Sequence, residues 1–548
     1  MKKIPFAVFI IFLFSKCHAQ LPPGVEAKID SVFQQWNNAG SPGAAVAIVK
    51  DGKTIFTKGY GIANLEYGIP ITPASVFHIA SESKKYTAFS IALLAKQGKL
   101  SLDDDIRKYL PYVQDFRKKI TIRHLISHTS GLRDQWQSLV IAGGQMDDVI
   151  SQDHVIKFVS QQKELNFDPG ERMLYCNTGY TLLAEIVKKA SGQSLRAFTE
   201  QNIFKPLKMT NAHFNDNYTE IVKNRVNSYY PAGIGRYSNS VLSYSTVGAT
   251  SLLTTVEDEA KWLINYENMQ VGSKELFDQV FETSVLNNGN KTEYGFGVFI
   301  NNYKGHKRIG HGGADAGFRS YSCYYPNDRL GIVIFSNLGV MNPTGLSEKI
   351  ADIMFGDKNS ETKPGNTSNG DTASFKYFTG SYLSPEMGSL GVVEKNTRLF
   401  LQLGGGEFPM SYEKEKTYSL FDGFFSIRFD RAAAGKSTGM EIKSFGSTLY
   451  AKRFTPASLN ERDLDAYTGT YYSDELDATY YIVKENGQLL LRHRKHPDGT
   501  LRPITASQFS SSNWWMDNLL FNTDTGGKIT GFEVNAQRVL HLKFKKIK

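Results

Sequence analysis

Cysteine is scarce in this chain, with only three among 548 residues. Cys17 lies near the N-terminus, and the other two are Cys176 and Cys323. Cysteines this sparse are more typical of buried packing residues than of a disulfide framework. A bond between Cys176 and Cys323 would restrain the segment around Cys176, and the sequence leaves their redox state open.

Long hydrophobic runs are also lacking, because the apolar run over residues 4–14 is too short to span a membrane. Lys2 and Lys3 precede this run and small residues follow it before Gln20, a pattern typical of a signal peptide over residues 1–19. We therefore expect an exported protein, periplasmic or secreted, with no transmembrane helix in the mature chain.

The signal peptide also contains a cysteine, which raises the alternative of lipid attachment. Lys16 directly precedes Cys17, where a lipoprotein signal usually has a small residue. The sequence therefore favours cleavage after Ala19 over a lipid anchor at Cys17.

Strong charge of one sign is absent as well. The formal net charge is +9, and the basic residues are scattered among acidic ones. This pattern does not support nucleic-acid binding, whereas a cell-envelope component or another acidic polymer stays open as a partner. Hydrophobic residues make up 41% of the chain, and its length predicts about two to four domains rather than one core.

The chain does contain three short elements that together describe a serine-nucleophile site. The first is Ser81-Glu82-Ser83-Lys84, which shares its Ser-x-x-Lys spacing with Ser160/Lys163, Ser360/Lys363 and Ser411/Lys414. Only Ser81 follows a short apolar segment and precedes an apolar helix, so it is predicted at a helix N-terminus, where negative charge is favoured. A serine needs a base during attack, and Lys84 serves only if it is neutral. The alternative is an ordinary solvated lysine.

The second element is Tyr175-Cys176-Asn177, between a turn signal at residues 167–170 and an apolar helix that opens at Thr178. Here a phenol can relay a proton and an amide can hold a substrate carbonyl. The alternative is a core tyrosine beside a turn asparagine.

The third element is His311-Gly312-Gly313, and His311 alone among the eleven histidines has glycine two residues later. A strand with almost no side chains lets a substrate backbone lie alongside it. Its N–H groups then complete an oxyanion hole with the N–H of Ser81. A glycine-rich hairpin turn is the alternative.

On these elements the chain resembles the penicillin-recognising serine hydrolases, specifically the class C β-lactamase and D-aminopeptidase group with its esterase relatives. The resemblance spans about residues 25–355. It implies that Ser81 forms an acyl-enzyme, that Lys84 and Tyr175 handle its proton, and that Asn177 binds the substrate carbonyl. Which of Lys84 and Tyr175 is the principal base stays open.

The resemblance also assigns roles to the glycine-rich strand. It implies that His311 and Gly313 bind substrate and that the N–H groups of Ser81 and Ala314 form the oxyanion hole. Antibiotic-destroying members commonly have lysine where this chain has His311. Because histidine is mostly neutral at neutral pH, a strong carboxylate anchor is disfavoured, and peptides, amides or esters are favoured over β-lactams.

No metal or other cofactor is expected. His124 and His128 are four residues apart, but the zinc-hydrolase pattern needs glutamate directly after the first histidine, where this chain has Leu125. These histidines are better interpreted as part of a structural loop near the site.

The predicted fold class is α+β, with a β-lactamase/transpeptidase-like domain over residues 20–355. We expect an antiparallel or mixed sheet flanked by helices, plus a mainly helical insert over residues 82–270. The expected strands cover residues 44–50, 53–59, 294–300, 307–311, 319–325 and 330–336, and helices are expected near residues 25–38 and 344–354.

A flexible linker is predicted over residues 356–374, which are rich in Asn, Thr, Ser, Gly and Lys. Two β-meander repeats follow, over residues 375–456 and 457–548, in which the pattern of residues 378–382 recurs at residues 467–471. They are predicted to form two small barrels or two halves of one, and they resemble lipocalin-like or D-aminopeptidase C-terminal barrels. Their role is either to cover the cleft or to serve as an appendage.

The leading hypothesis is an exported serine hydrolase that acts on a small peptide, amide or ester. A β-lactamase or penicillin-binding protein is one alternative, and a non-catalytic binding or sensor protein of the same fold is another. The sequence leaves open the natural substrate, its D or L preference and the oligomeric state.

Overall fold

A computed structural model describes residues 21–356, 372–414, 416–420, 425–430, 435–444 and 447–548. The predicted signal peptide lies outside these residues, as does the predicted linker except for Gly356 and the short 3-10 helix Thr372–Ser374. Within the described part of the chain, no helix combines the length and apolar character that a membrane crossing requires.

A six-stranded sheet forms the core of the first domain, and its strand order is β12-β13-β14-β15-β1-β2. All five pairings are antiparallel. The strands are β1 Ala44–Lys50, β2 Lys53–Tyr60, β12 Phe299–Tyr303, β13 His306–Asp315, β14 Phe318–Tyr325 and β15 Leu330–Ser336. Strands from the two ends of the domain therefore meet where β1 pairs with β15.

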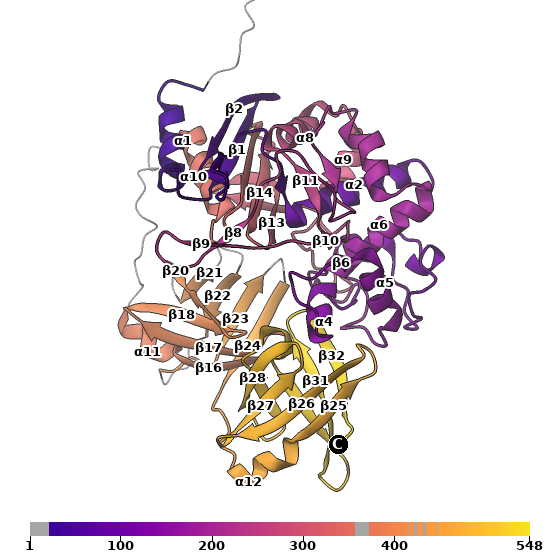
Figure 1. The fold of residues 1–548 in the computed structure, drawn as a ribbon, viewed down its shortest axis with the longest axis vertical. Coiled ribbons are helices and arrows are strands. Elements are labelled where there is room, and N and C mark those ends of the chain that lie inside the picture. Colours follow the sequence, from indigo (N-terminus) through magenta and orange to yellow (C-terminus); the bar gives the residue numbers. More distant parts are fainter. Residues whose placement is uncertain (1–20, 357–371, 415, 421–424, 431–434, 445–446) are drawn as a thin grey trace, which may run out of the picture.

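Both faces of this sheet are buried, which explains why β1 is apolar without alternation. Ala44, Val46 and Ile48 pack into the core that contains α1 and α10, whereas Ala45 and Ala47 pack into the larger core on the other face. Figure 1 shows α1 and α10 on one side of the sheet, with α8, α9 and α2 on the other.

The helical part of the domain lies between β2 and β12, as the sequence predicts. The α-helices of the described residues are α1 Val25–Phe33, α2 Ser83–Lys96, α3 Ile122–Ile126, α4 Gln135–Ile141, α5 Gln152–Gln161, α6 Asn177–Ser191, α7 Leu195–Thr199, α8 Val256–Asn268, α9 Lys274–Val280, α10 Pro343–Phe355, α11 Phe375–Phe378 and α12 Glu461–Leu464. Short strands interrupt the insert: β3 Ile62–Asn64, β4 Ile69–Pro70, β5 Phe77–His78, β6 Ile150–Ser151, β7 His213–Phe214, β8 Tyr229–Pro231, β9 Tyr237–Asn239, β10 Tyr244–Ser245 and β11 Leu252–Thr254.

One strand prediction was wrong in its bounds. The sequence predicts a strand over residues 294–300, but β12 begins at Phe299. Tyr294 is fully buried through ring contacts with His128, Phe299 and His311, and Gly297 adopts a positive φ of 75°. The apolar run is thus a packed loop, because aromatic burial produces the same sequence pattern as a buried strand.

Each C-terminal repeat forms its own antiparallel sheet. The first is nine-stranded, with β19 and β20 as its end strands, and the second is a closed barrel of β25 to β32. The strands are β16 Gly380–Ser384, β17 Gly388–Lys395, β18 Arg398–Leu403, β19 Gly406–Pro409, β20 Ser411–Lys414, β21 Thr417–Leu420, β22 Phe425–Phe429, β23 Gly439–Ser444, β24 Ser447–Phe454, β25 Gly469–Ser473, β26 Ala478–Glu485, β27 Gln488–His493, β28 His496–Pro503, β29 Gln508–Ser511, β30 Leu519–Thr523, β31 Ile529–Ala536 and β32 Val539–Lys546.

The internal repeat has a shared physical basis. Tyr382 and Tyr471 are both fully buried, and each donates its hydroxyl hydrogen to the backbone oxygen four residues earlier, at 2.6 Å and 2.7 Å. Together with the six-stranded sheet, these repeats confirm the predicted α+β fold followed by barrel-like repeats.

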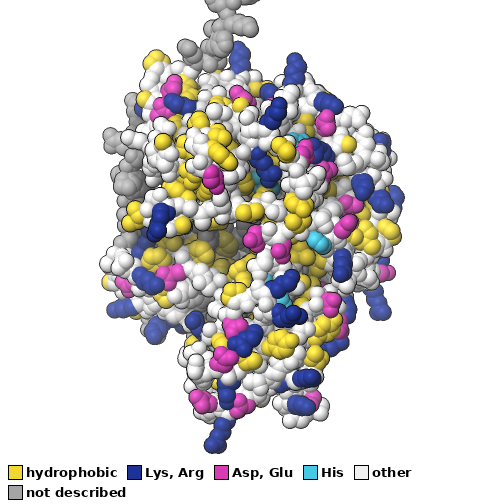
Figure 2. Space-filling model, in the orientation of Figure 1, with side chains coloured by type: hydrophobic (Ala, Val, Ile, Leu, Met, Phe, Trp, Pro, Cys, Tyr) yellow, Lys and Arg dark blue, Asp and Glu magenta, His cyan; other side chains and the backbone are white. Residues whose placement is uncertain are grey.

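In Figure 2, basic and acidic side chains are interspersed on the visible face.

Candidate active site

Ser81 lies in a sharp turn between a strand and a helix. β5 ends at His78, a 3-10 turn covers Ala80–Glu82, and α2 begins at Ser83. Ala80 adopts a positive φ of 49°, a conformation that costs energy for a residue with a side chain. The turn places Ser81 directly before the start of α2.

Lys84 is completely buried beside Ser81. Its Nζ lies 3.1 Å from Ser81 Oγ, 2.8 Å from Asn177 Oδ1 and 2.8 Å from the backbone oxygen of Ala249. Burial lowers the pKa of Lys84 to about 7, although the charges of Asp315 and Asp134 oppose this shift. A large neutral fraction at neutral pH follows, which is what a base for Ser81 requires.

Tyr175 covers the other side of the pair. The centre of its ring is 4.9 Å from Lys84 Nζ. Burial raises the pKa of its phenol far above 10, and a hydrogen bond with Ser81 offsets only part of that shift. Tyr175 is therefore a neutral phenol at physiological pH, able to donate or relay a proton.

Asn177 connects this pair to the helical insert. It is the first residue of α6, and its backbone N–H and its side-chain Nδ2 both donate to Asp134 Oδ2, at 2.7 Å and 2.9 Å. Its Oδ1 faces Lys84 Nζ, so the amide orients the lysine. The sequence predicts Asn177 but not this contact, because Asp134 belongs to no motif.

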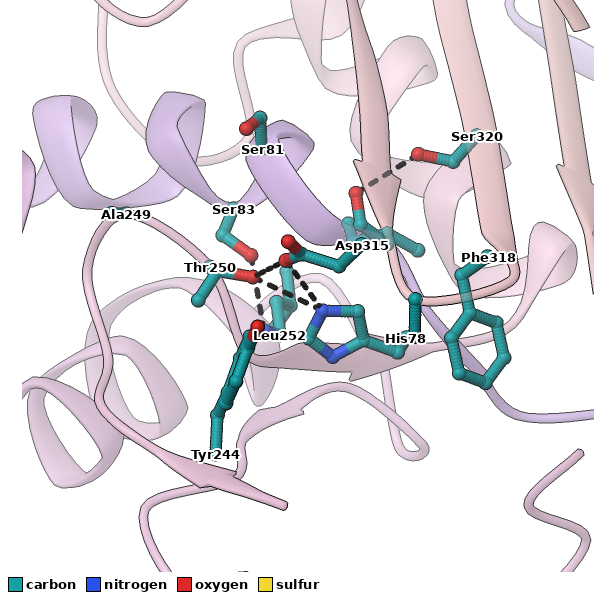
Figure 3. A network of polar contacts seen from close by, with 12 residues as sticks. His78, Ser81, Ser83, Tyr244, Ala249, Thr250, Leu252, Asp315, Phe318 and Ser320 are labelled. Atoms are coloured by element: carbon teal, nitrogen blue, oxygen red, sulfur yellow. Dashed lines mark hydrogen bonds and ion pairs between the residues drawn. The ribbon is translucent and has the colours of Figure 1, made fainter. Parts of the chain in front are cut away.

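β13 runs directly past the Ser81 turn. A side chain at Gly313 would meet the backbone oxygen of Ile79 at 2.2 Å, and Ser320 on β14 donates to that same oxygen at 2.9 Å, as Figure 3 shows. Glycine is thus required here by close backbone approach. Ala314, next along the strand, is exposed, and Ser81 is partly exposed.

His311 belongs to the same strand, β13, and its side chain is buried. Its side chain is only 3% exposed, with Nε2 lying 3.2 Å from the Tyr294 hydroxyl oxygen and Nδ1 lying 2.6 Å from the Gly312 oxygen. Burial lowers the pKa of His311 to about 3, so the imidazole is neutral, as the sequence suggests. Its contacts within the protein fix the strand that a substrate would lie against.

A largely buried acid–histidine pair lies near Ser81 (Figure 3) and was not predicted from the sequence. His78 Nε2 lies 3.0 Å from Asp315 Oδ2, and the Thr250 hydroxyl donates to the same oxygen. Figure 3 shows Asp315, His78 and Thr250 grouped below the turn that carries Ser81. The place of Asp315 at the end of the glycine-rich strand is the signal that could have found it.

A second buried cluster lies on another face of α2. Lys85 Nζ binds Glu82 Oε2 at 2.7 Å, Glu259 Oε1 at 2.6 Å and Ser322 Oγ at 2.7 Å. The direction of Glu82, which the sequence leaves open, is therefore inward, away from Ser81 and toward Lys85. This cluster joins α2 to α8 and β14.

His124 and His128, which are four residues apart in the insert, each contact other groups of the protein. His124 Nδ1 accepts a hydrogen bond from the N–H of Thr121 and completes the cap of α3. The ring of His128 lies 4.2 Å from that of Tyr175, and its Nδ1 accepts from the N–H of Cys176 at 3.0 Å. Both Cys176 and Cys323 are buried free thiols.

A residue of the C-terminal barrel also reaches the site. Arg538, in the turn between β31 and β32, places its guanidinium 5.0 Å from the centre of the Tyr175 ring. Its positive charge also lowers the pKa of Lys84. Nothing in the local sequence marks Arg538, because its position depends on how the barrel docks.

A partly exposed serine beside a buried lysine at a helix start, flanked by a tyrosine and by a glycine-rich strand, defines a serine hydrolase. The family model described as Beta-lactamase matches residues 29–353, more than half of the chain. The chain therefore belongs to the beta-lactamase family.

Similarity extends beyond that domain. A D-aminopeptidase of Brucella anthropi is 25% identical over 528 residues, which cover 92% of this chain and 95% of that protein. The octameric penicillin-binding protein homologue of Pyrococcus abyssi has a TM-score of 0.58 at 24% identity, covering 78% of this chain and 99% of that one. The D-amino acid amidase of Ochrobactrum anthropi SV3, complexed with L-phenylalanine amide, has a TM-score of 0.52 at 22% identity, covering 62% and 99%.

Proposed function

We propose that this serine hydrolase is an aminopeptidase or amidase that removes an N-terminal residue, of D configuration, from short peptides or amides. The observation that carries the catalytic part is the contact between Ser81 and a buried Lys84 whose pKa is lowered to about 7. The D-aminopeptidase names of relatives that cover nearly the whole chain support the substrate class.

In the proposed mechanism Lys84 is the base. A neutral amine has two N–H bonds and one lone pair, which suit the two acceptors Asn177 Oδ1 and Ala249 O together with the Ser81 hydroxyl. Ser81 Oγ attacks the substrate carbonyl carbon while its proton moves to Lys84. Tyr175 keeps its proton in the resting enzyme, because its pKa is raised.

Collapse of the tetrahedral intermediate breaks the carbon–nitrogen bond. The leaving nitrogen takes a proton from Lys84 through the Tyr175 hydroxyl, and an ester on Ser81 remains. Water then attacks this ester while its proton moves to Lys84. Lys84 returns that proton to Ser81 Oγ as the carbon–oxygen bond breaks, and the acid product leaves. The N–H groups of Ser81 and Ala314 are proposed to hold the carbonyl oxygen during both steps.

Charge near the nucleophile supports a substrate with a free amino group. Asp315 is the largest source of negative charge acting on Lys84, and its side chain keeps 13% exposure. A substrate ammonium placed beside Ser81 would be attracted to this carboxylate. The neutral His311, by contrast, offers no cation for a carboxylate on the strand side, which disfavours the β-lactamase alternative.

The test is a substrate panel with a matched serine control. Wild type, Ser81→Ala and Ser160→Ala, which alters another Ser-x-x-Lys serine, are assayed on D- and L-alanine p-nitroanilide, p-nitrophenyl acetate and a chromogenic cephalosporin. We expect Ser81-dependent turnover that is fastest with D-alanine p-nitroanilide and unchanged in Ser160→Ala. Preference for the cephalosporin, or turnover that survives Ser81→Ala, would contradict the proposal.

We also propose export with cleavage after Ala19, on the strength of the N-terminal sequence. N-terminal sequencing of the mature protein from the periplasm or medium should begin at Gln20. An uncleaved N-terminus or a lipid on Cys17 would contradict this part.

A further inference from the structure

We propose that Arg538, delivered by the C-terminal barrel, binds the carboxylate of the leaving group, so that the preferred substrates are short peptides with a free C-terminus. This inference rests on the proposed function, because it assigns the part of the substrate beyond the cleaved bond. Four observations support it: the docking of the hairpin, the uncommitted charge of Arg538, the pocket beside it and its place next to Tyr175.

The hairpin that carries Arg538 is held by the hydrolase domain in a fixed register. Gln137 on α4 donates to the oxygen of Ala536 at 2.8 Å and accepts from the N–H of Arg538 at 3.0 Å. Asn166 donates to the oxygen of Arg538 at 3.0 Å and accepts from the N–H of Leu540 at 2.8 Å. Each of these two side-chain amides therefore donates to a backbone oxygen and accepts from a backbone N–H of the hairpin, as a neighbouring strand would.

A buried ion pair reinforces this contact. Arg133 lies 2.6 Å from Glu475 of the barrel and donates to the oxygen of Leu540 at 3.1 Å. The next residue, Asp134, donates its N–H to the oxygen of Arg538 at 3.2 Å and also holds Asn177. A chain of hydrogen bonds through Asp134 and Asn177 thus connects the backbone of Arg538 to Lys84.

The guanidinium of Arg538 is free to meet a ligand. It is partly exposed, and among the described residues no carboxylate forms an ion pair with it. Arg172, the other arginine nearby, is instead paired with Glu171 at 2.7 Å and Glu386 at 3.2 Å. An arginine fork without a carboxylate, held beside a reacting centre, suits recognition of a planar anion.

A pocket of about 480 Å³ opens beside Arg538 and Tyr175. It lies between the hydrolase domain and both C-terminal repeats. Its apolar lining includes Leu174, Leu286, Met387, Leu403, Leu449 and Leu540. The pocket thus offers an apolar wall for a side chain next to a cation for a carboxylate.

Chemistry places the leaving group at this pocket. Tyr175 relays the proton to the leaving nitrogen, so that nitrogen lies against the phenol. In a dipeptide the carboxyl carbon is two bonds from this nitrogen, so the carboxylate falls close to the Tyr175 ring over which Arg538 lies. Asp315 toward the ammonium and Arg538 toward the carboxylate would then read the two ends of one short peptide.

The experiment compares three substrates that differ at the leaving group alone: D-alanyl-glycine, D-alanyl-glycinamide and D-alanine p-nitroanilide. Arg538→Gln should lower kcat/KM for D-alanyl-glycine by about tenfold or more, mainly through KM, because a charge-assisted hydrogen bond is lost. The two substrates without a carboxylate should change by less than about threefold. Arg538→Lys should recover part of the loss, and Arg494→Gln, an exposed arginine of the same barrel, should have no effect.

A second readout does not depend on turnover. D-alanyl-glycine should raise the Tm of Ser81→Ala but not of Ser81→Ala/Arg538→Gln, and D-alanyl-glycinamide should raise neither as much. Equal loss on all three substrates would overturn the inference and make Arg538 a structural residue of the interface. Failure of wild type to turn over any D-alanyl substrate would overturn the proposed function, while an Arg538-dependent Tm shift would still support carboxylate binding.

Discussion

The two sides of α2 contain adjacent lysines that are buried to the same degree but have opposite electrostatic environments. Lys84 faces Ser81 and neutral oxygens of Asn177 and Ala249, and burial lowers its pKa to about 7. Lys85 faces the carboxylates of Glu82 and Glu259. Their charges outweigh burial and raise its pKa.

The difference shows that the partner, rather than burial, decides whether a buried lysine is a base or a structural cation. Desolvation disfavours the charge at both positions, and only Lys85 has carboxylates in contact that restore it. A single step along α2 thus separates a group suited to chemistry from one suited to joining α2, α8 and β14.

Substituting each lysine in turn should separate catalysis from stability, and the largest effect is expected for Lys84. Lys84→Met should lower kcat/KM by about 10² to 10⁴, since it removes the general base, and should leave the Tm nearly unchanged. Steady-state kinetics on D-alanine p-nitroanilide and a thermal melt measure the two effects. A large loss of Tm would instead show that Lys84 is structural.

Lys85→Met should mainly lower the free energy of unfolding. It leaves Glu82 and Glu259 together without their cation, and breaking a buried pair costs about 3–5 kcal/mol. Urea unfolding measures the change in the free energy of unfolding. The triple variant Glu82→Gln/Lys85→Met/Glu259→Gln should regain part of the loss, and no recovery would show that another contact of Lys85 dominates.

The pH profile should report Lys84 alone. A lysine base is active when neutral, so kcat/KM should rise about tenfold per pH unit below pH 7 and level off above it. Lys85 keeps its charge over this range, because its pKa is raised. A profile whose acid limb lies near pH 5 would assign the limb to a carboxylate instead.

Asp315→Asn should shift the same pH profile by a smaller amount. The carboxylate raises the pKa of Lys84, so its removal should move the acid limb to lower pH by less than about one unit. p-Nitrophenyl acetate, which has no ammonium, separates this shift from substrate binding. A limb that moves to higher pH would contradict the assigned sign.

The catalytic motifs could be read from the sequence because each is a local pattern beside a strong helix or strand signal. Ser81 and Lys84 are one helical turn apart, and the hairpin of β1 and β2 was predicted within one residue, over 44–50 and 53–59. The domain boundaries and the roles of the individual site residues stay predictions.

Residues contributed by distant segments could not be read in this way. Asp134 and Arg538 reach the site through tertiary contacts, and no local pattern marks a carboxylate or guanidinium for such a place. The boundary of β12 was missed for a related reason, since the burial of Tyr294 depends on rings from other elements.

The docking of the β31–β32 hairpin has a consequence for biosynthesis. A ribosome makes Ser81 and Lys84 hundreds of residues before Arg538, yet Asp134, which positions Asn177 against Lys84, completes its contacts only with the hairpin. A nascent chain would therefore carry its nucleophile through synthesis in an unfinished setting. Hydrolytic competence would arrive late, with the folding of the barrel, after the chain had acquired the arginine that we propose selects its substrates.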